Sequence, residues 1–247
     1  MTFLNSNVFF LLLIFVIAFL YASVGHGGAS GYLAVMALFS FTPSLMKSSA
    51  LLLNIFVSLI AFYQYYKGGY LKWKLFLPFA IGSIPASFIG SLITIDAILY
   101  KKIIGLLLIF PILLLLNVIG KSSNEIKDVK VRLALLIGVS IGVLSGMIGI
   151  GGGIILSPII LMLHWGNIKQ TACVSALFIF VNSISGLIGL VSKGEIINSQ
   201  IYVWVLIALT GGYLGAYYGR NKFSNLSLKR ILAVALIIAS IKLIIVV

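Results

Sequence analysis

Residues 25–29 read GHGGA and residues 149–153 read GIGGG, and these two glycine-rich stretches decide how the chain is interpreted. Each one interrupts a long apolar run, 8–40 in the first case and 131–163 in the second. A helix needs about 20 residues to cross a bilayer, so each run is too long for a single crossing. We therefore predict that both runs break at their glycines, and we name these stretches the first break and the second break.

The rest of the chain has the composition of a polytopic membrane protein. Of its 247 residues, 62% are apolar and 9% are charged, and a soluble fold of this length cannot bury so much apolar surface. Six further apolar runs are long enough to span, at 45–66, 75–93, 97–119, 168–192, 200–219 and 227–247. We predict an all-α membrane protein, in which the single cysteine, Cys173, forms no disulfide and no metal cluster.

The two halves of the chain repeat each other. The glycines of the first break match those of the second at a constant shift, and Phe56-Val57 matches Phe180-Val181 at the same shift. The predicted domains are a first membrane repeat over 1–120, a polar connecting loop over 121–130 and a second membrane repeat over 131–247. Each repeat holds one broken segment and three transmembrane helices.

Charge in the loops predicts the orientation of the repeats, because cytoplasmic loops carry the excess of Lys and Arg. If each broken segment enters the membrane and returns on the same side, twelve loop Lys and Arg residues share one face. Only Lys47, Lys101, Lys102 and Lys193 then lie on the other. This distribution favours inverted repeats with re-entrant broken segments and both termini outside.

Matching glycine breaks in two membrane repeats are typical of a transporter binding site, because irregular backbone survives in a bilayer only where it lines a cavity or is buried in protein. The helix that starts after each break presents free N–H groups and the positive end of its dipole, which suits an anion near the midplane. The predicted substrate-binding residues are Gly25, His26, Gly27, Gly28, Asn54, Gly149, Gly151, Gly152, Gly153, Thr171, Ser175 and Asn182.

Several of these residues have an alternative interpretation. Asn54, Thr171, Ser175 and Asn182 could equally form hydrogen bonds between helices. His26 could carry a proton, donate to an anion or be a neutral structural residue. Lys47, at the start of a span, could attract anions or extend to the headgroup interface. The glycine ridges at 138, 142, 146 and at 211, 215, 219 have small-xxx-small spacing and are predicted to pack helices together.

Other functional classes lack support. The chain is strongly basic, with a net charge of +13, but it has no nucleic-acid recognition motif, no phosphate-binding loop and no catalytic constellation. We expect no enzyme activity, cofactor or metal. Asp96, Glu125, Asp128 and Glu195 fall in loops or at span ends, so a carboxylate relay for protons or sodium is missing. The expected partners are a small anion and the lipid bilayer, with a homodimer as a further option. A passive anion channel or a structural membrane subunit is the alternative function.

The whole chain resembles the TauE/SafE family of sulfite and organosulfonate exporter-like permeases. The resemblance rests on the Gly-x-Gly-Gly-Gly break that opens each half, the hydroxyl-rich segment after it and a Lys-Gly turn. Residues 149–153 with Pro158 match the family motif, whereas the first copy has Ala29 in place of a glycine and no proline at the position of Pro158. The resemblance implies a multi-pass protein of the prokaryotic cell (inner) membrane that moves sulfite or a short sulfonate.

Overall fold

The computed structural model describes residues 2–96, 98–100, 102–103, 106, 126–197, 199–221 and 237. The predicted spans 97–119 and 227–247, and residues 121–125 of the connecting loop, lie almost wholly outside this set. The described residues form helices and no strand. The helices are α1 (Thr2–Ser23), α2 (Ala29–Leu38), α3 (Pro43–Lys67), α4 (Trp73–Leu92), α6 (Val131–Ile148), α7 (Gly153–Met162), α8 (Ile168–Ser192) and α9 (Ile201–Asn221).

The structure confirms that both long apolar runs are interrupted at their glycines. The first becomes α1 and α2, and the second becomes α6 and α7. Within the described residues, α3, α4, α6, α8 and α9 are the five helices that are long and apolar enough to cross a membrane. The chain is thus a multi-pass membrane protein, as its composition predicts.

Local signals set the ends of the two central helices. Pro43 occupies the first turn of α3, where its missing N–H costs nothing. α8 begins with a capping box, in which the side chain of Asn167 accepts from the Gln170 N–H at 2.9 Å and that of Gln170 accepts from the Asn167 N–H at 3.1 Å. Both helices are 25 residues long.

The glycine ridge of α6 packs against α4, as the spacing predicts. Gly138, Gly142 and Gly146 face the carbonyl oxygens of Phe79, Ser83 and Ser87, so closely that a methyl group does not fit at any of the three. The residue numbers rise together along the two helices, which therefore run parallel. Close backbone contact of this kind is what small residues provide between membrane helices.

The glycine ridge of α9 packs against α1 in the same way. Gly211, Gly215 and Gly219 face the carbonyl oxygens of Phe15, Phe19 and Ser23, again with no room for a methyl group. These helices also run parallel. One helix of each half thus packs against the first helix of the other half.

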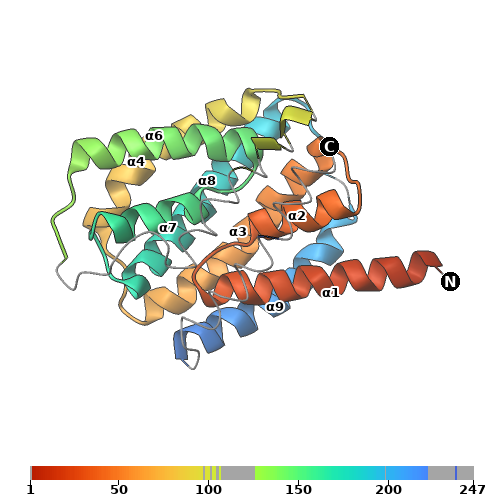
Figure 1. Cartoon of the computed structure of the whole chain (residues 1–247), viewed down its shortest axis with the longest axis horizontal. Helices are drawn as coiled ribbons and strands as arrows, with labels where there is room; N and C mark the ends of the chain where they lie inside the picture. Colours follow the sequence, from red (N-terminus) through yellow and green to blue (C-terminus); the bar gives the residue numbers. More distant parts are fainter. Residues whose placement is uncertain are drawn as a thin grey trace.

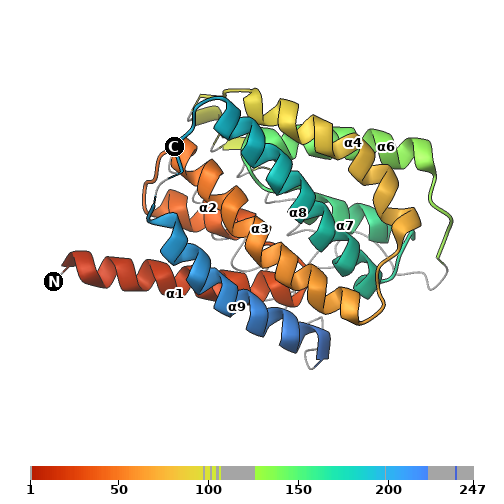
Figure 2. The same cartoon turned by 180° about the vertical axis from the view of Figure 1, so that it is seen from behind.

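α3 and α8 lie between these two pairs. Figure 1 shows α4 and α6 along the upper edge and α1 and α9 along the lower edge, with the other helices between them. Seen from behind in Figure 2, α3 and α8 lie in front of α2 and α7. The outward faces remain apolar, with Ile81, Leu136 and Leu206 more than 60% exposed. That surface suits contact with lipid acyl chains.

Candidate functional site: two glycine breaks joined by Asn54

The first break turns the chain between α1 and α2. Gly25 has φ +80° and Gly28 has φ +99°, which are left-handed conformations that glycine adopts without steric cost. Gly28 is the N-cap of α2, and no side chain caps the helix from that position. The first N–H groups of α2 therefore face the break.

The second break has the same construction. Gly149, Gly151 and Gly152 have φ values of +88°, +71° and +76°. Gly152 is the N-cap of α7 and again supplies no side-chain cap. Each half therefore starts a short helix directly from a left-handed glycine, and the positive end of each helix dipole points into its break.

Asn54 links the two breaks. It lies near the middle of α3 and is fully buried. Its Oδ1 accepts from the Ala29 N–H at 3.0 Å, and its Nδ2 donates to the Ile150 carbonyl oxygen at 3.2 Å. One amide side chain thus holds the start of α2 and the backbone of the second break together.

The same two breaks also meet the middle of α8. A methyl group on Gly27 or Gly151 would collide with both the Asn54 amide and the Ile179 side chain. A methyl group on Gly153 would collide with Ile179 as well. Asn54 and Ile179, from the two central helices, therefore mark the place where the breaks approach each other.

His26 reaches from the first break to the second half. Its Nδ1 lies 3.1 Å from the Val24 carbonyl oxygen and its Nε2 lies 2.9 Å from the Ser157 hydroxyl of α7. A carbonyl only accepts, so in the neutral ring Nδ1 carries the hydrogen and Nε2 accepts from Ser157. The Ser157 hydroxyl has two further acceptors within reach, Ser175 Oγ of α8 at 2.7 Å and the Gly153 carbonyl oxygen at 3.0 Å. A chain of three polar side chains thus crosses between the halves.

Several buried hydroxyls beside the breaks have no hydrogen-bond partner among the described residues. They belong to Tyr32, Ser145 and Ser183. A methyl group on Gly28 would meet the Tyr32 hydroxyl and one on Gly151 the Ser183 hydroxyl, and one on Gly152 would touch Cβ of Ser145. A buried hydroxyl without a partner costs free energy, so these groups remain available to a polar ligand.

Two predicted residues lie apart from this group. Asn182 donates through Nδ2 to the Ser83 hydroxyl at 3.0 Å and to the Phe178 carbonyl oxygen at 2.8 Å, which puts its amide in the α4–α8 contact. The Thr171 hydroxyl is buried, has no partner in the described chain and lies close to Gly166. Among the predicted polar side chains, Asn54 bonds to both breaks, and His26 and Ser175 both bond to Ser157.

Each break also packs on the central helix of the opposite half. Gly25 lies against Ala172 of α8, and Gly149 lies against Lys47 of α3. Lys47 is buried, with 8% of its surface exposed, and its Nζ donates to the Ser91 carbonyl oxygen at 3.1 Å. A Lys47 side chain that reached the headgroup interface would be exposed, whereas this one is buried and bonded to protein.

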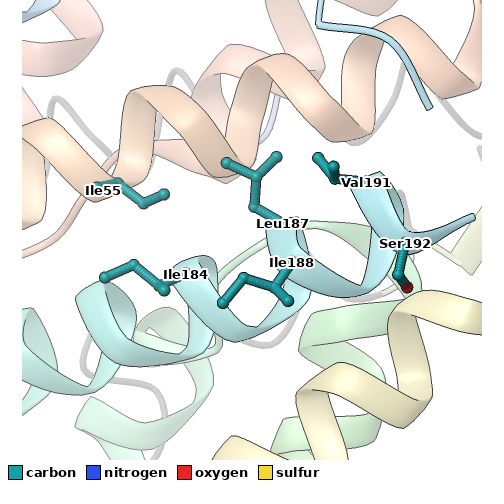
Figure 3. Close-up of a pocket in the computed structure, with 6 residues that line it drawn as sticks. All are labelled: Ile55, Ile184, Leu187, Ile188, Val191 and Ser192. Carbon is teal, nitrogen blue, oxygen red and sulfur yellow. The ribbon is translucent and has the colours of Figure 1, made fainter. Parts of the chain in front are cut away.

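The breaks are tightly packed, and two hollows on the surface of the described chain lie elsewhere: one beside Ile60 and Leu209, and one along α3 and α8. A groove of about 390 Å³ runs between α3 and α8, and Figure 3 shows it lined by Ile55, Ile184, Leu187, Ile188, Val191 and Ser192. Five of these side chains are aliphatic, and the Ser192 hydroxyl donates to the Gly189 carbonyl oxygen at 2.8 Å. This groove offers an anion no set of donors, so it is not a candidate for the substrate site.

The sequence does not single out Ser157, Tyr32, Ser145 or Ser183. Ser157 had a usable signal, since it follows Gly153 by one helical turn and therefore lies on the same face as the start of α7. The other three are hydroxyls within apolar segments, and many such hydroxyls simply bond to their own helix. Only the fold shows which ones meet a break.

The chain is similar to known membrane proteins over most of its length. The family described as "Sulfite exporter TauE/SafE" matches residues 10–243. The chain is 38% identical to "Probable membrane transporter protein y4hK" of Sinorhizobium fredii, over 93% of this chain and 94% of that protein. It is 27% identical to "Probable membrane transporter protein YdhB" of Bacillus subtilis, over 92% and 94% of the two chains. No solved structure gives a significant match.

Proposed function

Since this chain belongs to the sulfite exporter TauE/SafE family of membrane transporters, we propose that it moves a small anion through a site where its two glycine breaks meet. The observation that carries this proposal is the double contact of Asn54. It joins the first N–H of α2 to the backbone of the second break near the middle of α3. Two helix N-termini directed at one place favour negative charge there.

The polar groups around the breaks suit oxyanion oxygens. The backbone N–H groups of Gly27, Gly28, Gly151, Gly152 and Gly153 and the hydroxyls of Ser145 and Ser183 can donate without adding charge. Gly25, Gly27, Gly28, Gly149, Gly151, Gly152 and Gly153 supply backbone, and Asn54, His26 and Ser175 supply side chains. We place Thr171 at the margin of this site and assign Asn182 to helix packing.

The distribution of acidic residues also supports an anion. Asp96 follows α4, Asp128 precedes α6 and Glu195 follows α8, so the described spanning helices contain no carboxylate. A transported cation would find no counter-charge among them. An anion leaving a cell with a negative interior gains about 2.3 kcal/mol per charge per 100 mV, so export needs no coupling ion.

The substrate class follows from the family, and sulfite or a short organosulfonate is the proposed substrate. We expect a jump of external sulfite to drive an electric current across liposomes that hold the purified protein, with chloride giving a much smaller one. The reason is that sulfite carries net charge and, in this proposal, no cation is transported with it. Sulfite uptake without current would instead indicate electroneutral transport, for example cotransport of the anion with a proton carried on His26.

We also propose that the halves are inverted repeats in the cytoplasmic membrane. α4 runs parallel to α6 and α9 runs parallel to α1, and this exchange of partners is what a two-fold axis in the membrane plane would give. Both proposed broken segments then return to the side from which they enter. In this proposal the loop before α6, described from residue 126 to 130, lies inside and the loop after α8 lies outside.

Labelling of introduced cysteines tests this topology. In a Cys173→Ala background, we expect Ile196→Cys to react with an impermeant maleimide in intact cells, because this position is 88% exposed in the loop after α8. Asp128→Cys, which is also exposed, should react only after the cells are opened. Labelling of Asp128→Cys in intact cells would refute the proposed orientation.

A further inference from the structure

Lys47 is an unusual residue for its position. Among the residues whose side chains the structure describes, it is the only buried Lys, Arg, Asp or Glu. An ammonium has three donors, and one of them bonds to the Ser91 carbonyl oxygen. A buried charge is costly unless it is paired, and a single carbonyl is a weak partner for it.

The side chain of Lys47 covers the second break. A methyl group on Gly149 would lie 2.9 Å from its Cγ, so the stem of the lysine rests on this left-handed glycine. Ser145, whose hydroxyl has no partner in the described residues, is one helical turn before Gly149 on α6. A positive charge and an available hydroxyl thus stand at the same end of the second break.

The charged groups that face Lys47 are Lys193 and Glu195. Lys193 is exposed and its Nζ donates to the Leu92 carbonyl oxygen at 2.8 Å. Glu195 accepts from the Ser44 hydroxyl at 2.5 Å. Taken together, Lys47, Lys193 and Glu195 carry one net positive charge. Lys47 and Lys193 thus bond to neighbouring carbonyl oxygens of the last turn of α4.

Lys47 has no charged counterpart at the matching position of the second half. The shift that relates Gly25 to Gly149 also relates Lys47 to Thr171, whose buried hydroxyl is neutral and without a partner in the described chain. The position that matches Lys47 in the second half therefore carries no charge.

We propose that Lys47 is the charge partner of the transported anion at the mouth of the second break. The ammonium leaves the Ser91 carbonyl oxygen and donates to oxygens of the anion instead. The backbone N–H groups of the second break then donate to the same anion. This inference rests on the proposed transport function and specifies the residue that selects for negative charge.

Three variants test the proposal, with labelled sulfite uptake into liposomes as the measurement. Lys47→Met should raise the half-saturating sulfite concentration roughly ten- to hundredfold, which corresponds to the loss of one charge-assisted hydrogen bond. Lys47→Arg should restore most of the affinity. Lys193→Met removes a neighbouring cap of α4 without touching a break, so its half-saturating concentration should stay within about threefold of the wild type.

The outcomes separate this inference from the proposed function. Equal effects of Lys47→Met and Lys193→Met, or an unchanged half-saturating concentration in Lys47→Met, would overturn the role of Lys47 while leaving transport established. If the wild type takes up no sulfite, the melting temperature of the purified protein is measured with and without sulfite. A rise that is lost only in Lys47→Met would support the anion site, and no rise in the wild type would overturn both proposals.

Discussion

Replacing Asn54 by leucine is expected to abolish sulfite uptake while the protein still folds and inserts. Leucine has a similar size but removes both hydrogen bonds, so the Ala29 N–H and the Ile150 carbonyl oxygen are left unpaired in a buried place. Each unpaired group costs about 1–3 kcal/mol, and the two breaks lose the group that aligns them. Uptake by liposomes with matched protein content measures the effect.

Ser87→Ala is the matched control for that variant. Ser87 is also fully buried, and its hydroxyl donates to the Asn182 carbonyl oxygen at 2.9 Å, in the α4–α8 contact away from the breaks. Loss of an interhelical hydrogen bond of this kind costs about 0.6 kcal/mol, which should lower stability slightly and leave uptake intact. Equal uptake by Asn54→Leu and Ser87→Ala would show that Asn54 is not part of the substrate site.

Replacing Gly152 by alanine is also expected to abolish uptake. Gly152 has φ +76°, where an alanine costs about 1–2 kcal/mol. Its Cβ would in addition lie 2.6 Å from Cγ2 of Ile141 and 2.9 Å from Cε1 of Phe178, two side chains that hold the start of α7 from either side. The start of α7 must shift, and its N–H groups then miss the anion.

Gly194→Ala separates backbone strain from crowding. Gly194 has φ +86°, close to that of Gly152, but no atom lies within 4 Å of the position that a Cβ would take. Both variants should therefore lose similar conformational free energy, and only Gly152→Ala should lose uptake at matched protein content. Wild-type uptake by Gly152→Ala would contradict the role of the second break.

The sequence predicts the helices and their interruptions well, because these features depend on local composition. Helix α8 has the predicted limits of 168–192, and both broken runs divide at the glycines. The ridge at 138, 142, 146 correctly indicates close helix packing. It does not indicate that α4 is the partner, since a row of small residues fits any neighbouring backbone.

The roles of the polar residues likewise depend on tertiary packing, which the local sequence does not reveal. Asn54 and Asn182 are both asparagines within apolar spans, and both are predicted from the sequence to bind substrate. The fold directs the amide of Asn54 to the two breaks and that of Asn182 to Ser83 on α4. Lys47 similarly looks interfacial from its place near a helix start, and its burial depends on α4 and the second break packing over it.

The central claim is that an anion passes through a saturable site where the two glycine breaks meet at Asn54. The most direct measurement is the initial rate of labelled sulfite uptake into liposomes over a wide range of sulfite concentrations, for the wild type and for Asn54→Leu. The account predicts a rate that saturates in the wild type and falls to the level of empty liposomes in Asn54→Leu. A rate that rises linearly with sulfite in both proteins, as in a passive channel, would contradict it.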